Sequence, residues 1–161
     1  MGPYREAAAV AAIAVLIAAG AHGADEAARV MLAKWGGSYD ADALLREPAV
    51  RDELQKLLGK QLPHLERNLN VKGAIDVIGS ILSISGNAPH QGTLEEAVVC
   101  VRPTDLAIEA AILSRGMITV FSRAQKYEYA TLCIKDWITL ANSRHVDRLS
   151  RPKNVRVVNP R

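Results

Sequence analysis

Short catalytic signatures are the first thing that this 161-residue sequence lacks. It contains no G-x-S-x-G elbow, no G-x-G-x-x-G or P-loop glycine pattern and no H-E-x-x-H motif. These absences speak against the common serine hydrolase, nucleotide-binding and zinc peptidase sites. Metal-ligand spacing is missing too, because the histidines are scattered along the chain: His22, His64, His90 and His145. We therefore expect no catalytic residue, no metal and no cofactor.

Long hydrophobic runs are also scarce, and the single clear one lies at the N-terminus, from Ala7 to Ala19. It is too short to cross a bilayer comfortably, and the small residues Ala19-Gly20-Ala21 follow it. A buried alanine-rich helix would carry a polar stripe, which this run does not have. A retained membrane anchor is the other alternative, and the small residues weigh against it. We predict a cleavable signal peptide over residues 1–21, with cleavage after Ala21 or Gly23.

Cysteine is rare as well: the chain has only Cys100 and Cys133. Export would bring both to oxidising conditions, where they can form a disulfide. Such a bridge would stabilise the fold by roughly 3–4 kcal/mol in the chain-entropy model. Two buried thiols are an equally good interpretation, since both cysteines stand among apolar residues. The sequence leaves this choice open, and neither cysteine resembles a nucleophile.

Excess positive charge is confined to the C-terminal segment, residues 144–161. This segment contains six Lys and Arg residues and a single acidic residue, Asp147. This segment contains Pro152 and Pro160 and no stacking aromatic residue. We predict a solvated, partly disordered basic tail rather than a nucleic-acid-binding arm. Residues 22–143, which carry a slight net negative charge, are long enough to form a single domain.

The pattern of apolar residues in this domain predicts an α+β fold. Helices are expected over 25–35, over 48–58 with Pro48 at the first turn, and from Thr131 to Ala141. Strands are expected over 75–84 with a bulge at Gly79, and over 97–102, 106–113 and 117–122. We predict an antiparallel meander of about four or five strands, with N-terminal helices and a C-terminal helix packed on it.

Most polar and aromatic residues have ordinary structural interpretations. The tryptophans Trp35 and Trp137 lie at apolar positions and are expected in the core. Acidic pairs, including Glu95 and Glu96, are expected at the solvated surface.

One loop departs from this pattern: residues 85–93, in which glycines stand on both sides of Pro89-His90. Glycines permit sharp exit and re-entry of the chain, proline fixes the backbone before the histidine, and binding residues often sit on such loops. An exposed loop histidine is usually inert, so this pattern alone makes His90 a candidate binding residue and no more. The candidate site comprises Gly86, Asn87, Ala88, Pro89, His90, Gln91 and Gly92.

From Leu32 to Leu140 the order of features resembles the Ivy family of periplasmic inhibitors of vertebrate-type lysozyme. The matching stretches are Leu32-Ala33-Lys34-Trp35 with Tyr39, Leu44 to Val50, Leu57-Leu58-Gly59 and the Pro89-His90 loop. In that family the loop reads Cys-x-Pro-His-x-Cys with bridged cysteines. The resemblance implies that His90 enters the lysozyme cleft and satisfies its two carboxyl groups. It also implies lysozyme as the protein partner, a periplasmic location and no membrane association after signal cleavage, and it suggests a homodimer.

The sequence differs from the family pattern at the loop itself, because Asn87 and Gly92 occupy the two cysteine positions and Gln91 replaces a residue that is often acidic. An unbridged loop must be ordered on binding, which weakens affinity. Three hypotheses follow: a lysozyme inhibitor acting through His90, a divergent scaffold that binds another envelope or secreted protein, and a small periplasmic hydrolase using His90 as general base. The first is the one we expect.

Overall fold

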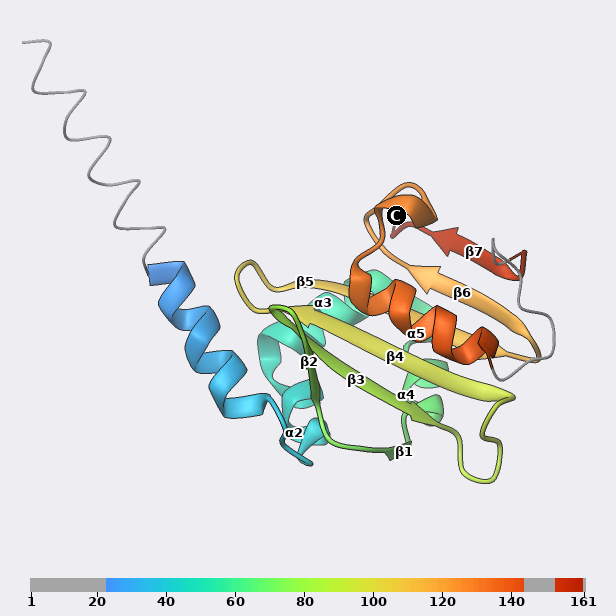
Figure 1. The fold of residues 1–161 in the computed structure, drawn as a ribbon, viewed down its shortest axis with the longest axis horizontal. Helices are drawn as coiled ribbons and strands as arrows, with labels where there is room; N and C mark the ends of the chain where they lie inside the picture. The colour runs from blue at the N-terminus through green and yellow to red at the C-terminus, as the bar shows by residue number, and fades with distance from the viewer. Residues whose placement is uncertain (1–22, 144–152, 161) are drawn as a thin grey trace, which may run out of the picture.

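In a computed structural model of the chain, a seven-stranded sheet carries helices on both faces (Figure 1). The structure describes residues 23–143 and 153–160; the predicted signal peptide lies outside these residues. The α+β class is confirmed, and the sheet has more strands than predicted.

The helices precede most of the sheet. A helix over 23–35 comes first among the described residues and extends away from the body of the protein (Figure 1). It is followed by α2 (Ala41–Arg46), α3 (Pro48–Leu58), the short helix η1 (Gly59–Gln61) and α4 (Leu62–Asn68). The predicted helix over 48–58 is confirmed, with Pro48 in its first turn and Gly59 closing it at a φ of 51°. This positive φ favours glycine at the end of the helix.

The strands are β1 (Val71–Lys72), β2 (Asp76–Ile78), β3 (Ile81–Asn87), β4 (Glu95–Arg102), β5 (Ala107–Ser114), β6 (Met117–Phe121) and β7 (Val155–Val158). Their order across the sheet is β1-β3-β4-β5-β6-β7, and β2 also pairs with β3. All pairings are antiparallel except that of β6 with β7. The consecutive pairing of β3 to β6 is the predicted meander.

Two cores lie on opposite faces of this sheet. Alternate strand residues such as Val99 and Ile112 pack beneath α2, α3 and α4, together with Trp35. The intervening residues, such as Val98 and Leu113, pack beneath α5 (Leu132–Ser143) together with Trp137. Because helices cover both faces, β4 is buried along nearly its whole length. The tryptophans lie in the core, as expected from the sequence.

Two local features differ from the sequence prediction. Gly79 is not a bulge: it stands with Ser80 in a two-residue turn, so residues 76–87 form the β2–β3 hairpin rather than one strand. Its φ of 63° suits such a turn and explains why glycine is there. The second feature is β7, which comes from the basic segment 144–161 and joins the sheet beside β6.

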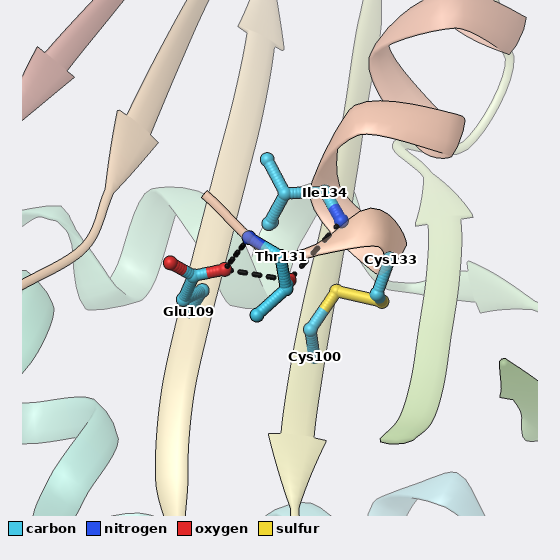
Figure 2. Close-up of a disulfide and its surroundings, with 5 residues drawn as sticks. All are labelled: Cys100, Glu109, Thr131, Cys133 and Ile134. Atoms are coloured by element: carbon cyan, nitrogen blue, oxygen red, sulfur yellow. Dashed lines mark hydrogen bonds between the residues drawn. A yellow bond between two sulfur atoms is a disulfide. The ribbon is translucent and has the colours of Figure 1, made fainter. Parts of the chain in front are cut away.

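A disulfide between Cys100 and Cys133 joins β4 to the start of α5, with Cα atoms 6.2 Å apart (Figure 2). The structure thus settles the pairing that the sequence left open. Glu109 on β5 lies beside it and accepts hydrogen bonds from the backbone N–H of Thr131 at 2.9 Å and from its hydroxyl at 2.6 Å. Thr131 Oγ1 in turn accepts from the Ile134 N–H at 3.5 Å, which is the hydrogen bond of an N-cap residue at the start of α5. The start of α5 is therefore fixed both covalently and by hydrogen bonds.

Candidate functional site

The loop between β3 and β4 projects from one end of the sheet (Figure 1). It follows Ala88, which is buried, and every residue from Pro89 to Leu94 is exposed. The candidate residues Gly86 and Asn87 belong to the end of β3 instead, where they pair with Ala97 and Glu96 on β4. The seven predicted residues therefore divide into a strand end and a projecting tip.

Backbone hydrogen bonds order this loop although it has no disulfide. The Ala88 N–H donates to the Glu95 carbonyl at 2.9 Å, and the Gln91 N–H donates back to the Ala88 carbonyl at 3.0 Å. The Gln91 carbonyl then accepts hydrogen bonds from the backbone N–H groups of Leu94 at 3.1 Å and of Glu95 at 3.0 Å. The loop thus consists of consecutive hydrogen-bonded turns, which lowers the ordering cost expected for an unbridged loop.

Asn87 and Gly92, the residues at the family's cysteine positions, face each other across the base of the loop. A Cβ atom built on Gly92 would lie 3.8 Å from Asn87 Nδ2 and 3.9 Å from Asn87 Cγ. Asn87 Nδ2 donates at 2.8 Å to the carbonyl of Ala88. The two positions are therefore near enough for the amide of Asn87 to fill the space between them.

His90 stands at the tip with an exposed side chain and a φ of 60°. Left-handed backbone is uncommon for residues other than glycine, although histidine and asparagine adopt it more often than most. Within residues 23–143 and 153–160, no hydrogen bond or ion pair involves the His90 imidazole. Both of its ring nitrogens are therefore available to a binding partner.

Gly86 has a steric reason to be glycine. A Cβ added there would lie 2.5 Å from the Val71 carbonyl oxygen and 3.1 Å from the Lys72 Cβ, since β1 pairs closely with β3 at this point. We expect Gly86→Ala to destabilise the fold by about 2 kcal/mol through this overpacking. Urea unfolding measures the change, and Gly92→Ala is the control because its Cβ meets no atom within 3.8 Å. Equal midpoints for the two variants would contradict this explanation.

A buried carboxylate lies immediately below the loop. Glu95, the first residue of β4, has a side chain only 10% exposed. Its Oε2 accepts from His64 Nε2 at 3.0 Å, Arg67 Nη2 at 3.1 Å and Asn68 Nδ2 at 3.1 Å, all on α4. Its Oε1 accepts from the Ser114 hydroxyl at 2.7 Å, at the end of β5. We call Glu95 and these donors the Glu95 cluster; it joins α4, β4 and β5 at the end of the sheet that carries the loop.

These contacts lower the pKa of Glu95. Burial raises the pKa, but hydrogen bonds from His64, Ser114 and Asn68 outweigh that effect and bring it from 4.5 to about 2. A shift of this size corresponds to roughly 3 kcal/mol of stabilisation of the folded state. Because the folded pKa is depressed, this stabilisation is complete above pH 4.5 and is lost as the pH falls towards 2.

We therefore expect Glu95→Gln to flatten part of the acid dependence of stability. The difference in free energy of unfolding between the wild type and this variant should shrink as the pH falls from 4.5 to 2. Urea unfolding over this pH series measures it. A difference that does not change with pH would show that the Glu95 charge contributes nothing.

A second hairpin turn, Arg115-Gly116 between β5 and β6, contacts the loop. The Arg115 N–H donates at 3.0 Å to the carbonyl of Leu94. Arg115 has a φ of 49° and an exposed side chain. Leu94 and Met117, on either side of this contact, are 56% and 50% exposed. The loop that carries His90 is therefore in contact with a turn that exposes a cation, and exposed apolar side chains lie beside this contact.

The Glu95 cluster was not predicted from the sequence. Glu95 and Glu96 were expected at the surface, and this was wrong, since they are only 7% and 4% exposed. One signal was present. Side chains alternate between the two faces of a strand, so Glu95 lies on the same face as Ala97 and Val99, which pack against the helices. Extending the predicted strand by two residues therefore places the Glu95 side chain on the core side. The structure brings His64 to this cluster and leaves His90 apart from it. Over the described part of the chain, no group of three or more metal-ligating residues is present.

Comparison with known families matches residues 49–142 to the family model described as inhibitor of vertebrate lysozyme (Ivy). The chain belongs to this family. The match runs from the start of α3 to the end of α5 and includes the projecting loop and the Glu95 cluster. No match was found among curated proteins or among solved structures. The described helices include none with the length and hydropathy needed to span a bilayer.

Proposed function

We propose that this chain is an exported inhibitor of vertebrate-type (c-type) lysozyme, which inserts its Pro89-His90 loop into the active-site cleft. The observation that supports this most is the ordered, projecting loop of an Ivy-family chain, with an imidazole at its tip that has no partner within the described residues. The chain acts as a protein ligand and not as an enzyme.

The chemistry of the cleft suits an imidazole. Lysozyme cleaves its polysaccharide with two carboxyl groups, a general acid of raised pKa and a second carboxyl that stays ionised. Protonated histidine donates through both ring nitrogens, and neutral histidine donates through one and accepts through the other. His90 can therefore hydrogen-bond to both carboxyl groups while the loop occupies the substrate's place.

The surroundings of His90 suit a protein interface. The exposed Leu94 and Met117 can bury apolar area against the rim of the cleft, and Arg115 can pair with an acidic or carbonyl group there. The contact between the loop and the Arg115-Gly116 turn keeps these side chains together. We assign the contact surface to residues 89–94 and 115–117.

The proposed function also requires export of the chain to the periplasm. The predicted signal peptide over residues 1–21 would direct the chain there, and the Cys100–Cys133 disulfide is of the kind that persists in an oxidising compartment. Lysozyme that attacks bacterial peptidoglycan would meet the inhibitor in this compartment.

A hydrolase using His90 as general base is the weaker hypothesis. Such an enzyme requires a carboxylate or nucleophile within hydrogen-bond reach of the imidazole. The described residues place none there: the Glu95 carboxylate is bound by His64, and Glu96 Oε1 accepts the Thr93 N–H.

The direct experiment measures lysis of peptidoglycan by a c-type lysozyme with and without the purified mature chain. We expect competitive inhibition that is saturable with inhibitor concentration. A folded chain that neither inhibits nor binds the lysozyme would overturn the proposal and favour the divergent scaffold with another protein partner.

A further inference from the structure

The end of the loop returns to the sheet at Glu95, whose backbone closes it. The Glu95 carbonyl accepts a hydrogen bond from the Ala88 N–H at 2.9 Å, and the Glu95 N–H donates to the Gln91 carbonyl at 3.0 Å. These two bonds join the outgoing and returning chains of the loop at one residue. The orientation of the loop therefore depends on how firmly Glu95 is held.

The side chain of Glu95 is held by donors from two other elements. His64, Arg67 and Asn68 come from α4, and Ser114 comes from the end of β5. Asn68 is fully buried and also donates to the carbonyls of Glu96 and Leu113, at 3.3 Å each. Hydrogen bonds to a charged acceptor are stronger than neutral ones. The carboxylate thus connects the base of the loop to the body of the protein.

Two other hydrogen bonds also support the loop. Thr93 donates its N–H to Glu96 Oε1 at 2.9 Å, and the Arg115 N–H donates to the Leu94 carbonyl at 3.0 Å. Each is a single bond to the returning half of the loop. The facing pair Asn87 and Gly92, where the family pattern has bridged cysteines, has no covalent link.

We propose that the Glu95 cluster takes the place of the missing loop disulfide and positions the Pro89-His90 loop for inhibition. Glu95 is a positioning residue that does not touch the lysozyme. This inference rests on the proposed function for its inhibitory consequence, while its structural part, the ordering of the loop by Glu95, stands independently of lysozyme.

The first test is amide hydrogen exchange of Glu95→Gln in the full mature chain. This nearly isosteric variant removes the charge, so we expect the amides of Ala88, Gln91 and Glu95 to exchange about tenfold faster. Glu109→Gln is the matched control, because Glu109 also accepts hydrogen bonds from neighbouring side chains but pairs with Cys100, about 17 Å along β4 from Glu95. The control should leave exchange in the loop unchanged. Unchanged loop exchange in Glu95→Gln would overturn the proposal.

The second test is rescue by a covalent bridge. Asn87→Cys with Gly92→Cys restores the family's pair at positions that face each other, and peptide mapping verifies that the new bridge forms beside Cys100–Cys133. Added to Glu95→Gln, the bridge should return the inhibition constant and the loop exchange to near their wild-type values. The matched pair Asn87→Ser with Gly92→Ser, which cannot form a bridge, should rescue neither.

The outcomes separate this inference from the proposed function. If the wild type does not inhibit lysozyme, the proposed function fails and the exchange experiment alone decides the role of Glu95. If the wild type inhibits but Glu95→Gln inhibits equally well, the positioning role is wrong. Loss of inhibition in Glu95→Gln that a verified bridge does not restore would also overturn it, because the loss would then not arise from the loop.

Discussion

Replacing His90 by asparagine is expected to weaken inhibition of c-type lysozyme by about 100-fold, the size of effect that a central contact residue has at protein interfaces. The variant removes the imidazole that, in the proposed function, bonds to the two carboxyl groups of the cleft. Asparagine also tolerates the φ of 60° at this position, so the loop should keep its backbone. The inhibition constant from a peptidoglycan lysis assay measures the effect.

The control for this experiment is Gln91→Ala. Gln91 is the exposed neighbour of His90, and the loop uses its backbone groups, which the substitution keeps. We expect its inhibition constant to change only a few-fold, as for most interface residues outside a hot spot. Equal inhibition by the wild type and His90→Asn would show that the imidazole does not enter the cleft.

Removing the disulfide should have the largest effect on stability. The double variant Cys100→Ala/Cys133→Ala opens a link across a sequence separation of 33 residues. The chain-entropy model predicts a loss of about 3–4 kcal/mol, which for a domain of this size lowers the Tm by about 10 °C. Thermal unfolding followed by circular dichroism measures the change.

The same double variant should still inhibit lysozyme at temperatures where it is folded. The bridge lies near the end of β4 opposite the loop, and Glu109 and Thr131 still hold the start of α5 (Figure 2). A Tm that changes by less than about 2 °C would mean that the bridge contributes little stability. Loss of inhibition in the folded variant would contradict the separation between the bridge and the site.

The sequence predicted the elements whose signals are local. Pro48 and Gly59 marked a helix because proline fits a first turn and glycine fits a positive φ at its end. The central strands were predicted from short apolar runs separated by turn residues, and such runs suit strands that are buried on both faces of the sheet. By contrast, β7 was missed because its four residues pair in parallel with β6, a non-local contact that leaves little trace in a basic, proline-containing segment.

The candidate site was predicted in part. The glycines and the Pro89-His90 pair indicated the projecting loop, and family resemblance suggested its role. The Glu95 cluster was missed because its members are distant in the sequence: His64 and Ser114 meet Glu95 only when α4 packs on β4 and β5 pairs with it. A glutamate before an apolar strand is usually solvated. Only the packed structure shows the donors that make its burial favourable.

Competition for the cleft is the most direct test of the account. Binding of the mature chain to a c-type lysozyme would be measured by calorimetry, first alone and then with the cleft saturated by an N-acetylglucosamine oligosaccharide. If the loop enters the active site, the apparent Kd must rise in proportion to the oligosaccharide concentration. An unchanged Kd, with chain and sugar bound together, would contradict the central claim that His90 occupies the place of the substrate.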